Sequence, residues 1–266
     1  MTKLRQTRQM IDAAMADAQR PALALSGGKD SLLLLALCKP YRKRLHVVWA
    51  RTSETFPHMV DFMREVTRGW DFQELVSDQS AYFATHGFPS ALIPVRHRPH
   101  EKNPGILIQS NGYCCKALQY KPLARYLKEY GTDLVLHGQT AEDLLNHKTS
   151  FPAMLSPLPR RRIVAPLRDW TAEEVLVYCQ RRRVPLPEQY ATGLADSLEC
   201  WNCTVRIDLA RFRWMQAHYP VLAEKLGALL GSVYGAAITD YETHIAPVLD
   251  AARNKEKDQK TKVATA

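Results

Sequence analysis

The sequence predicts an α/β protein with a mostly parallel sheet covered by helices on both faces. Short apolar runs typical of buried strands alternate along the chain with longer segments that have helical spacing. This alternation is typical of strand–helix–strand units, whose strands pair in parallel. The 266 residues, 46% of them hydrophobic, are enough for one large α/β domain with an appendage. We therefore expect a Rossmann-like domain followed by a helical C-terminal extension.

The elements follow one another in chain order. Residues 5–18 can form a short amphipathic helix, and four apolar residues at 22–25 predict the first strand. Further strands are expected at 45–50, 72–76 and 134–138, and helices at 32–37, 57–70, 118–130 and 171–183. Thr171 is a good N-cap for the last of these helices, because Glu173 and Glu174 follow in its first turn.

A glycine-containing motif, Ser26-Gly27-Gly28-Lys29-Asp30-Ser31, lies directly between the first strand and the helix that follows it. A strand that turns through glycines into a helix N-terminus exposes backbone N–H groups to an anion, and phosphate is the usual one. Lys29 adds a positive charge, and Asp30 is suited to help hold Mg²⁺. A turn needed only for chain reversal would not require these polar neighbours, so we predict a phosphate site, with Ser26 and Ser31 as hydroxyl donors.

Neighbouring strand ends extend this site. In parallel sheets, ligands bind at the carboxyl ends of the strands. Ser53 follows the second strand, and Gly138 and Gln139 follow the strand at 134–138. We therefore expect these three residues to contact the nucleotide as well.

The cysteines form a second pattern. Cys114 and Cys115 are adjacent, and Cys200-Trp201-Asn202-Cys203 forms a C-x-x-C. Four thiolates are enough for Zn²⁺ or for a [4Fe–4S] cluster, and the spacing alone does not separate the two. The other two cysteines, Cys38 and Cys179, fall on apolar faces of expected helices and are interpreted as core residues.

Charge and hydropathy bear on location and partners. The formal net charge is +9, which favours either a polyanionic partner, such as nucleic acid, or a solvated basic surface. The basic residues concentrate in three clusters and an earlier loop: Arg160 to Arg162, Arg181 to Arg183, Arg206 with Arg211 and Arg213, and Arg96, Arg98 and Lys102.

No run of 18 apolar residues and no apolar leader occurs, so we expect a cytoplasmic protein without a membrane span. Residues 93–112 are expected to form a loop over the nucleotide.

The hexapeptide resembles the SGGxDS loop of the PP-loop ATP pyrophosphatases, the adenine-nucleotide α-hydrolase family. The resemblance implies a loop that binds the β,γ-pyrophosphate of ATP, which this family cleaves to AMP and pyrophosphate. Lys29 and Asp30 are then the expected catalytic residues, with ATP and Mg²⁺ as cofactors.

Four further segments resemble the iron–sulfur APS/PAPS (phosphoadenosine phosphosulfate) reductases. They are Cys114-Cys115-Lys116 with Lys121-Pro122-Leu123, the segment 52–57, the segment 166–171, and Val184-Pro185 with Tyr190. This resemblance covers about residues 20–205. It implies a [4Fe–4S] cluster held by Cys114, Cys115, Cys200 and Cys203.

Two departures separate the chain from those reductases. Their C-terminal E-C-x-x-H segment, whose cysteine attacks the sulfate sulfur, has no counterpart, because no cysteine follows Cys203. Their Gly-x-Arg is replaced by Gly138-Gln139-Thr140, whereas the Lys-Asp-Ser ending of ATP-cleaving members is present. The segment 199–205 resembles the GCW-x-CTV segment of the PP-loop protein of bacterial DNA phosphorothioation systems.

Three functions follow as hypotheses. The preferred one is an ATP pyrophosphatase that activates an acceptor for sulfur transfer. Nucleic acid is one candidate acceptor, and a cysteine desulfurase is the expected sulfur donor. The alternatives are an APS/PAPS reductase that uses thioredoxin and a non-catalytic nucleotide-sensing or DNA-binding module. The expected organisation is an N-terminal helix (1–20), a PP-loop domain with the iron–sulfur site (21–205), a helical extension (206–253) and a disordered tail (254–266).

Overall fold

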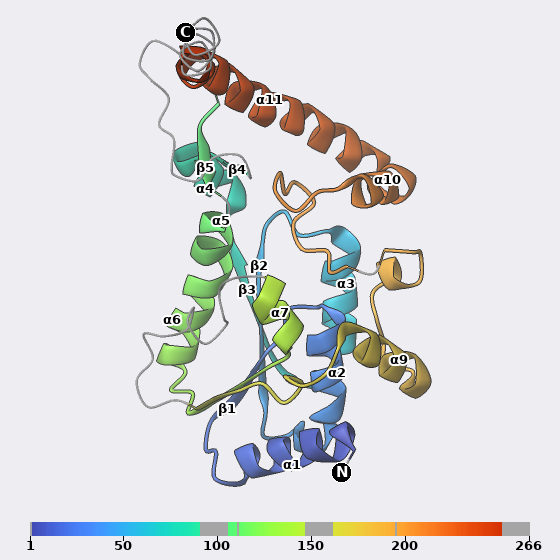
Figure 1. Ribbon diagram of the computed structural model, residues 1–266. Helices are drawn as coiled ribbons and strands as arrows, with labels where there is room; N and C mark the ends of the chain where they lie inside the picture. Colours follow the sequence, from blue (N-terminus) through green and yellow to red (C-terminus); the bar gives the residue numbers. More distant parts are fainter. Residues whose placement is uncertain (1, 91–105, 111, 147–161, 195, 252–266) are drawn as a thin grey trace, which may run out of the picture. The chain divides into compact units, whose positions relative to one another are not determined.

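The computed structural model describes residues 2–90, 106–110, 112–146, 162–194 and 196–251 (Figure 1). These residues form two compact units. The first unit comprises Met1–Tyr82 and Cys114–Trp201, and the second comprises Phe83–Tyr113 and Asn202–Ala266. The segment before Tyr113 thus groups with the C-terminal residues, whereas the sequence suggested a continuous domain from 21 to 205. The expected loop at 93–112 and the expected tail lie largely outside the described residues.

The first unit is built on a five-stranded sheet in which every neighbouring pair is parallel. The strands occur in the order β3 (Asp71–Ser77), β2 (His46–Thr52), β1 (Pro21–Ala24), β6 (Leu134–His137), β7 (Arg162–Val164). The chain first adds strands on one side of β1 and later on its other side. The direction of winding therefore changes at β1, and in such sheets the crevice at the carboxyl ends beside the switch is the usual ligand site.

The central strand is buried on both faces, which explains its uninterrupted apolar sequence. All four residues of β1 are buried, and Leu23 pairs with Val47 on one side and with Leu136 on the other. On one face of the sheet, Leu123 and Leu127 of helix α6 pack against this centre. The strands at 22–25, 45–50, 72–76 and 134–138 that the sequence predicted are all present, and β7 is an additional strand.

Helices cover the sheet on both faces (Figure 1). Those of the first unit are α1 (Lys3–Ala16), α2 (Lys29–Leu37), η1 (Lys39–Tyr41), α3 (Pro57–Val66), α6 (Lys121–Glu129), α7 (Ala141–Asn146), α9 (Ala172–Arg182) and η3 (Glu188–Tyr190). The predicted cap of α9 is confirmed, because the Thr171 side chain accepts from the backbone N–H of Glu174 and the Glu174 carboxylate accepts from that of Thr171. Helix α3 ends earlier than predicted, at Val66.

Two helices cross from one unit to the other. Helix α4 (Gln79–His86) leaves the first unit after Tyr82, and α5 (Tyr113–Cys115) enters it at Cys114. A π-helical stretch, η2 (Lys116–Tyr120), continues α5 directly into α6. Such stretches are rare and are often found at functional sites.

The second unit holds a parallel pair of short strands and the helical extension expected at the C-terminus. Strand β4 (Phe88–Ser90) pairs with β5 (Ile108–Ser110), and helix α10 (Leu209–His218) leads into the long α11 (Pro220–His244). Ile108 packs against Val233 and Ala237 of α11.

Helix α11 also bears on the expectation that no segment spans a membrane. From Pro220 to Ala251 the chain is helical, long enough and apolar enough to cross a membrane, and 22% of its most apolar window is buried. This property rests on length and composition alone and is shared with core helices of soluble proteins.

Candidate functional site

The hexapeptide Ser26 to Ser31 forms the turn between β1 and α2, at the switch point of the sheet. Gly27 has a φ of +85°, a conformation that residues with a Cβ rarely adopt. A Cβ at Gly27 would lie 2.8 Å from Cε of Met59, which is the end of a flexible side chain on α3 and can move aside. The backbone conformation therefore explains the glycine.

The Ser31 hydroxyl holds this turn together from inside. It accepts hydrogen bonds from the backbone N–H groups of Ser26 and Gly27, both at 3.2 Å, and donates to the carbonyl of Gly28 at 3.0 Å. Ser31 is almost fully buried. In the structure this hydroxyl organises the backbone of the loop, and its expected role as a direct phosphate donor stays a prediction.

The charged pair of the motif lies at the start of α2. Lys29 Nζ is 3.0 Å from a carboxylate oxygen of Asp30, and both side chains are more than four-fifths buried. Burial raises the pKa of Asp30, the Lys29 charge lowers it, and the nearby carboxylate of Asp143 raises it further, with a net increase. A carboxylate and an ammonium group thus lie together in a poorly solvated place. An added phosphate would be attracted strongly to the ammonium group there, and an added cation to the carboxylate.

The end of β6 lies directly against this helix start. A Cβ at Gly138 would be 2.7 Å from the backbone nitrogen of Ser31, which leaves room only for glycine. Gln139 and Thr140 follow in the turn to α7. Gly138 therefore lies directly against the phosphate loop, and contact of Gly138 or Gln139 with a nucleotide stays a prediction.

Asp143 is a site residue that the sequence analysis missed. Its carboxylate accepts from the backbone N–H and the hydroxyl of Thr140, at 2.8 and 3.0 Å. Its charge raises the pKa values of both Asp30 and His137, so this carboxylate lies within electrostatic range of both side chains. The T-x-x-D pattern after an expected strand end was the available signal, because this pattern is typical of a helix start.

His137, at the end of β6, stays neutral. Burial lowers the pKa of its imidazole to about 4, although the Asp143 charge opposes this shift.

The end of β2 is tied to α4 and to the C-x-x-C segment. Ser53 Oγ accepts from the backbone N–H of Gln79 at 3.1 Å, so the hydroxyl supports the start of α4. Trp201 Nε1 donates to the Glu54 carboxylate at 2.9 Å, and Thr55 forms an antiparallel bridge with Cys200. The structure thus joins the segment 52–55 to the first cysteine of the C-x-x-C, and contact of Ser53 with nucleotide stays a prediction.

The four cysteines of the expected metal site are all free thiols. Cys114, Cys115 and Cys200 belong to the first unit, and Cys203 belongs to the second. Cys200 Sγ is 3.2 Å from the Thr52 hydroxyl, and Cys203 Sγ accepts from the backbone N–H of Arg206 at 3.3 Å. Within the described parts of the chain, no three His, Cys, Asp or Glu side chains are arranged to hold a metal ion. The chemistry of four reduced thiols fits an iron–sulfur cluster, and the cluster itself stays a prediction.

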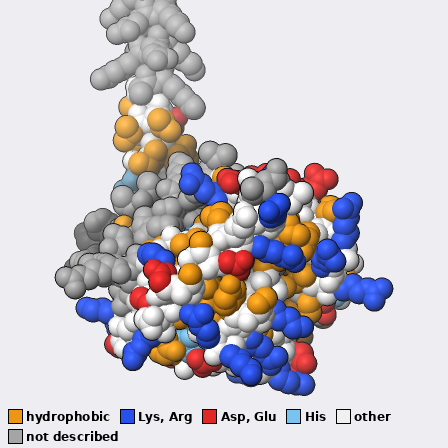
Figure 2. Space-filling model, turned by 90° about the horizontal axis from the view of Figure 1, so that it is seen from below, with side chains coloured by type: hydrophobic (Ala, Val, Ile, Leu, Met, Phe, Trp, Pro, Cys, Tyr) orange, Lys and Arg blue, Asp and Glu red, His pale blue; other side chains and the backbone are white. Residues whose placement is uncertain are grey.

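The basic residues are distributed more widely than the sequence suggested. Arg181, Arg182 and Arg183 are exposed at the end of α9, but Arg211 is only 4% exposed and is not available as a surface contact. Arg96, Arg98, Lys102, Arg160 and Arg161 lie outside the described residues. Figure 2 shows Lys and Arg side chains also spread over the face seen from below, with acidic and apolar side chains among them.

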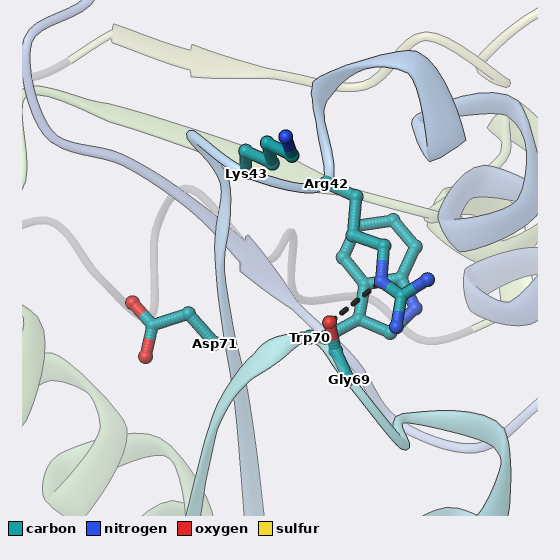
Figure 3. Close-up of a pocket in the computed structure, with 5 residues that line it drawn as sticks. All are labelled: Arg42, Lys43, Gly69, Trp70 and Asp71. Atoms are coloured by element: carbon teal, nitrogen blue, oxygen red, sulfur yellow. Dashed lines mark hydrogen bonds between the residues drawn. The ribbon is translucent and has the colours of Figure 1, made fainter.

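One hollow lies away from the phosphate loop. Its volume is about 540 Å³, and it is lined by Arg42, Lys43, Gly69, Trp70 and Asp71, before the amino ends of β2 and β3 (Figure 3). Arg42 Nε donates to the carbonyl of Gly69 at 2.6 Å, so this guanidinium is used to hold two loops together. Parallel sheets bind their ligands at the opposite ends of the strands, and we assign this hollow no role in the site.

Most of the chain matches a known protein family. The profile of the family described as the phosphoadenosine phosphosulfate reductase domain matches residues 20–206. An adenosine 5'-phosphosulfate reductase of Deinococcus radiodurans is 33% identical over 101 residues, 38% of this chain and 38% of that protein. An uncharacterized protein of Methanocaldococcus jannaschii is 21% identical over 203 residues, 76% of this chain and 45% of that protein. The chain thus matches less than half the length of these curated relatives.

Among solved structures, the fold resembles that of the phosphoadenylyl-sulfate (PAPS) reductase from Candida auris. The TM-score is 0.51 at 18% identity, and the match covers 74% of this chain and 88% of that one. At this identity the similarity establishes the fold, a mostly parallel sheet between helices.

Proposed function

We propose that this chain, which belongs to the phosphoadenosine phosphosulfate reductase domain family through the profile match over residues 20–206, cleaves ATP to AMP and pyrophosphate. The purpose of this cleavage is to activate an acceptor for sulfur transfer. In the first step an acceptor oxygen attacks the α-phosphorus, and the bond from that phosphorus to the pyrophosphate breaks. In the second step sulfur displaces AMP from the acceptor.

One observation carries this proposal. The complete Lys-Asp-Ser ending of the motif is located at the switch point of the sheet, with Lys29 and Asp30 paired at 3.0 Å in a mostly buried position. A reductase acting on a sulfated nucleotide has no pyrophosphate to release and no evident use for this pair. The chain also lacks a cysteine after Cys203 that could attack sulfur.

The residues of the loop would share the work as follows. Lys29 would exchange Asp30 for the pyrophosphate and stabilise the negative charge that builds up as the bond to the α-phosphorus breaks. Asp30 would hold Mg²⁺, which neutralises phosphate charge when bound. Ser31 would maintain the shape of the loop through the hydrogen bonds described above.

We further propose that Cys114, Cys115, Cys200 and Cys203 hold a [4Fe–4S] cluster. Such a cluster, when bound, can carry sulfur or electrons. The support is the type and number of the ligands, together with the link from Cys200 to the end of β2 through the bridge to Thr55. A cysteine desulfurase is the expected sulfur donor, and nucleic acid is an expected acceptor because the net charge is +9.

Pyrophosphate release tests the main proposal. The anaerobically purified protein is incubated with ATP and Mg²⁺, with and without DNA or RNA, and AMP and pyrophosphate are measured. Release of AMP and pyrophosphate that depends on added ATP supports the proposal, and the absence of both products under all of these conditions contradicts it.

The second candidate is an APS/PAPS reductase, favoured by the similarity to the Deinococcus radiodurans enzyme. It would require an external thiol, for which thioredoxin is the expected source. Release of sulfite from APS or PAPS in the presence of thioredoxin would establish it. Tight ATP binding without either reaction would instead favour a nucleotide-sensing or DNA-binding module.

A further inference from the structure

Tyr190 and Ser197 lie against the phosphate loop. The phenolic oxygen of Tyr190, at the end of η3, accepts a hydrogen bond of 3.1 Å from the backbone N–H of Lys29. Ser197 is also close, because a Cβ at Gly28 would lie 3.4 Å from Cβ and 4.0 Å from Oγ of Ser197. The hydrogen bond joins residues 161 positions apart in the sequence, and together with Ser197 it gives the loop a second wall.

Lys29 is the first residue of α2, and its N–H is one of the amides that a helix leaves without a partner inside the helix. Gly28, the N-cap, has no side chain to accept from these amides. Tyr190 fills that role from a distant part of the chain. An anion approaching the helix start along this N–H would therefore meet the phenol before it reached the amide.

A phenol can accept one hydrogen bond and donate another at the same time. The Tyr190 oxygen already accepts from Lys29, and no other described residue receives its proton. The pKa of Tyr190 is raised above its ordinary value, chiefly by burial, so the hydroxyl keeps its proton at neutral pH. Donation by the Lys29 amide also polarises the O–H group and makes it a stronger donor.

We propose that Tyr190 is a phosphate-binding residue, which accepts from the Lys29 amide and donates its own proton to the pyrophosphate portion of the nucleotide. The hydroxyl thereby extends the positive end of α2 by one hydrogen bond. Ser197, on the same wall, is a second and weaker donor. This inference rests on the proposed nucleotide function and deepens it by adding recognition from outside the hexapeptide.

The test compares wild-type protein with Tyr190→Phe by calorimetric titration with MgATP, with inorganic pyrophosphate and with adenosine. Loss of a hydrogen bond to a charged group weakens binding by about 10- to 100-fold. We expect such a loss for MgATP and pyrophosphate, with adenosine binding unchanged. Tyr178→Phe on α9, where the ring packs edge-on against Trp170, is the matched control and should bind all three ligands like wild type.

Equal binding of pyrophosphate by wild type and Tyr190→Phe would overturn the inference, as would an equal loss for adenosine, which indicates a structural role. If circular dichroism shows that Tyr190→Phe does not fold, Ser197→Ala takes its place. We expect Ser197→Ala to lose less affinity for pyrophosphate than Tyr190→Phe would. An unchanged affinity would contradict the proposal that both residues line the phosphate site.

The outcomes also separate this inference from the proposed function. Binding that depends on Tyr190 without release of pyrophosphate would retain the inference and reject ATP cleavage. Cleavage of ATP at the wild-type rate by Tyr190→Phe, with unchanged affinity, would support ATP cleavage and reject the role of Tyr190. Failure of the wild-type protein to bind ATP or pyrophosphate would reject both.

Discussion

At the scale of single residues, the phosphate loop combines groups that organise it with groups left for a ligand. The Ser31 hydroxyl donates a hydrogen bond to the loop backbone, and the Asp143 carboxylate accepts hydrogen bonds from Thr140. Lys29 instead pairs with its neighbour Asp30, in a pair that a phosphate can open. Among these residues, Lys29 is therefore the one whose loss should affect the reaction most and the fold least.

We expect Lys29→Met to lower the rate of pyrophosphate release by about 10²- to 10³-fold, because a donor placed at developing negative charge contributes that much. The measurement is the single-turnover rate with saturating ATP and Mg²⁺. Lys43→Met, at the hollow before β2, is the matched control and should retain the wild-type rate. An unchanged rate in Lys29→Met would show that the leaving group is stabilised elsewhere.

His137 makes stability depend on pH. Folding lowers the pKa of this histidine from 6.5 to about 4, so the folded protein favours the neutral imidazole. Its contribution is fully present above pH 6.5 and is lost as the pH falls towards 4, a change of about 3 kcal/mol. Urea denaturation between pH 7.5 and 4.5 should show this loss.

The variant His137→Gln should have a flatter profile than wild type over that range, since its side chain does not titrate. His244→Gln, at the exposed end of α11, is the control and should keep the wild-type profile. Parallel profiles for wild type and His137→Gln would mean that another group causes the pH dependence.

At the scale of elements, the site depends on how closely β6 approaches the start of α2. Gly138 permits this approach, because the nearest atoms to a Cβ there belong to the backbone of Asp30 and Ser31 and cannot rotate away. The same glycine thus serves the packing of the sheet on α2 and the position of the phosphate loop.

Gly138→Ala should lower the free energy of unfolding by about 1–3 kcal/mol, the usual cost of overpacking, and should weaken ATP binding as α2 shifts. Gly231→Ala is the matched control, since a Cβ there has no atom within 4 Å and lies inside a helix. It should be neutral or stabilise by about 1 kcal/mol. Denaturation and ATP titration of both variants check this, and equal stability of Gly138→Ala and wild type would contradict the packing argument.

At the scale of the whole molecule, the chain forms two units, and the four cysteines are divided between them. Three belong to the unit that carries the phosphate loop, and Cys203 belongs to the unit that contains α10 and α11.

Anaerobically purified protein should absorb near ~400 nm and contain iron, and Cys114→Ala or Cys200→Ala should lose both properties. Cys38→Ala and Cys179→Ala are the controls, because burial raises the pKa of these thiols to about 12 and about 11 and makes them poor ligands. A colourless protein that contains zinc would contradict the assignment.

Much of the fold was predictable because it depends on local pattern. The apolar run at 22–25 and the glycines after it predict a strand, a turn and a helix start. Thr171 and Glu174 predict the start of α9 for the same reason, since a cap acts over three residues. The short strands β4 and β5 were not predicted, because three residues are too few to show a period and their pairing joins segments far apart.

The sequence by itself indicated the family and predicted the phosphate loop and the candidate ligands, since each depends on residues that are neighbours in the chain. The tertiary structure decided what those residues do. It turned Ser31 and Ser53 towards the backbone, brought Asp143 within electrostatic range of Asp30, and placed the Tyr190 hydroxyl on the Lys29 amide. Hydrogen bonds and charges act over a few ångströms in space, and only the folding of the sheet brings such distant residues within that range.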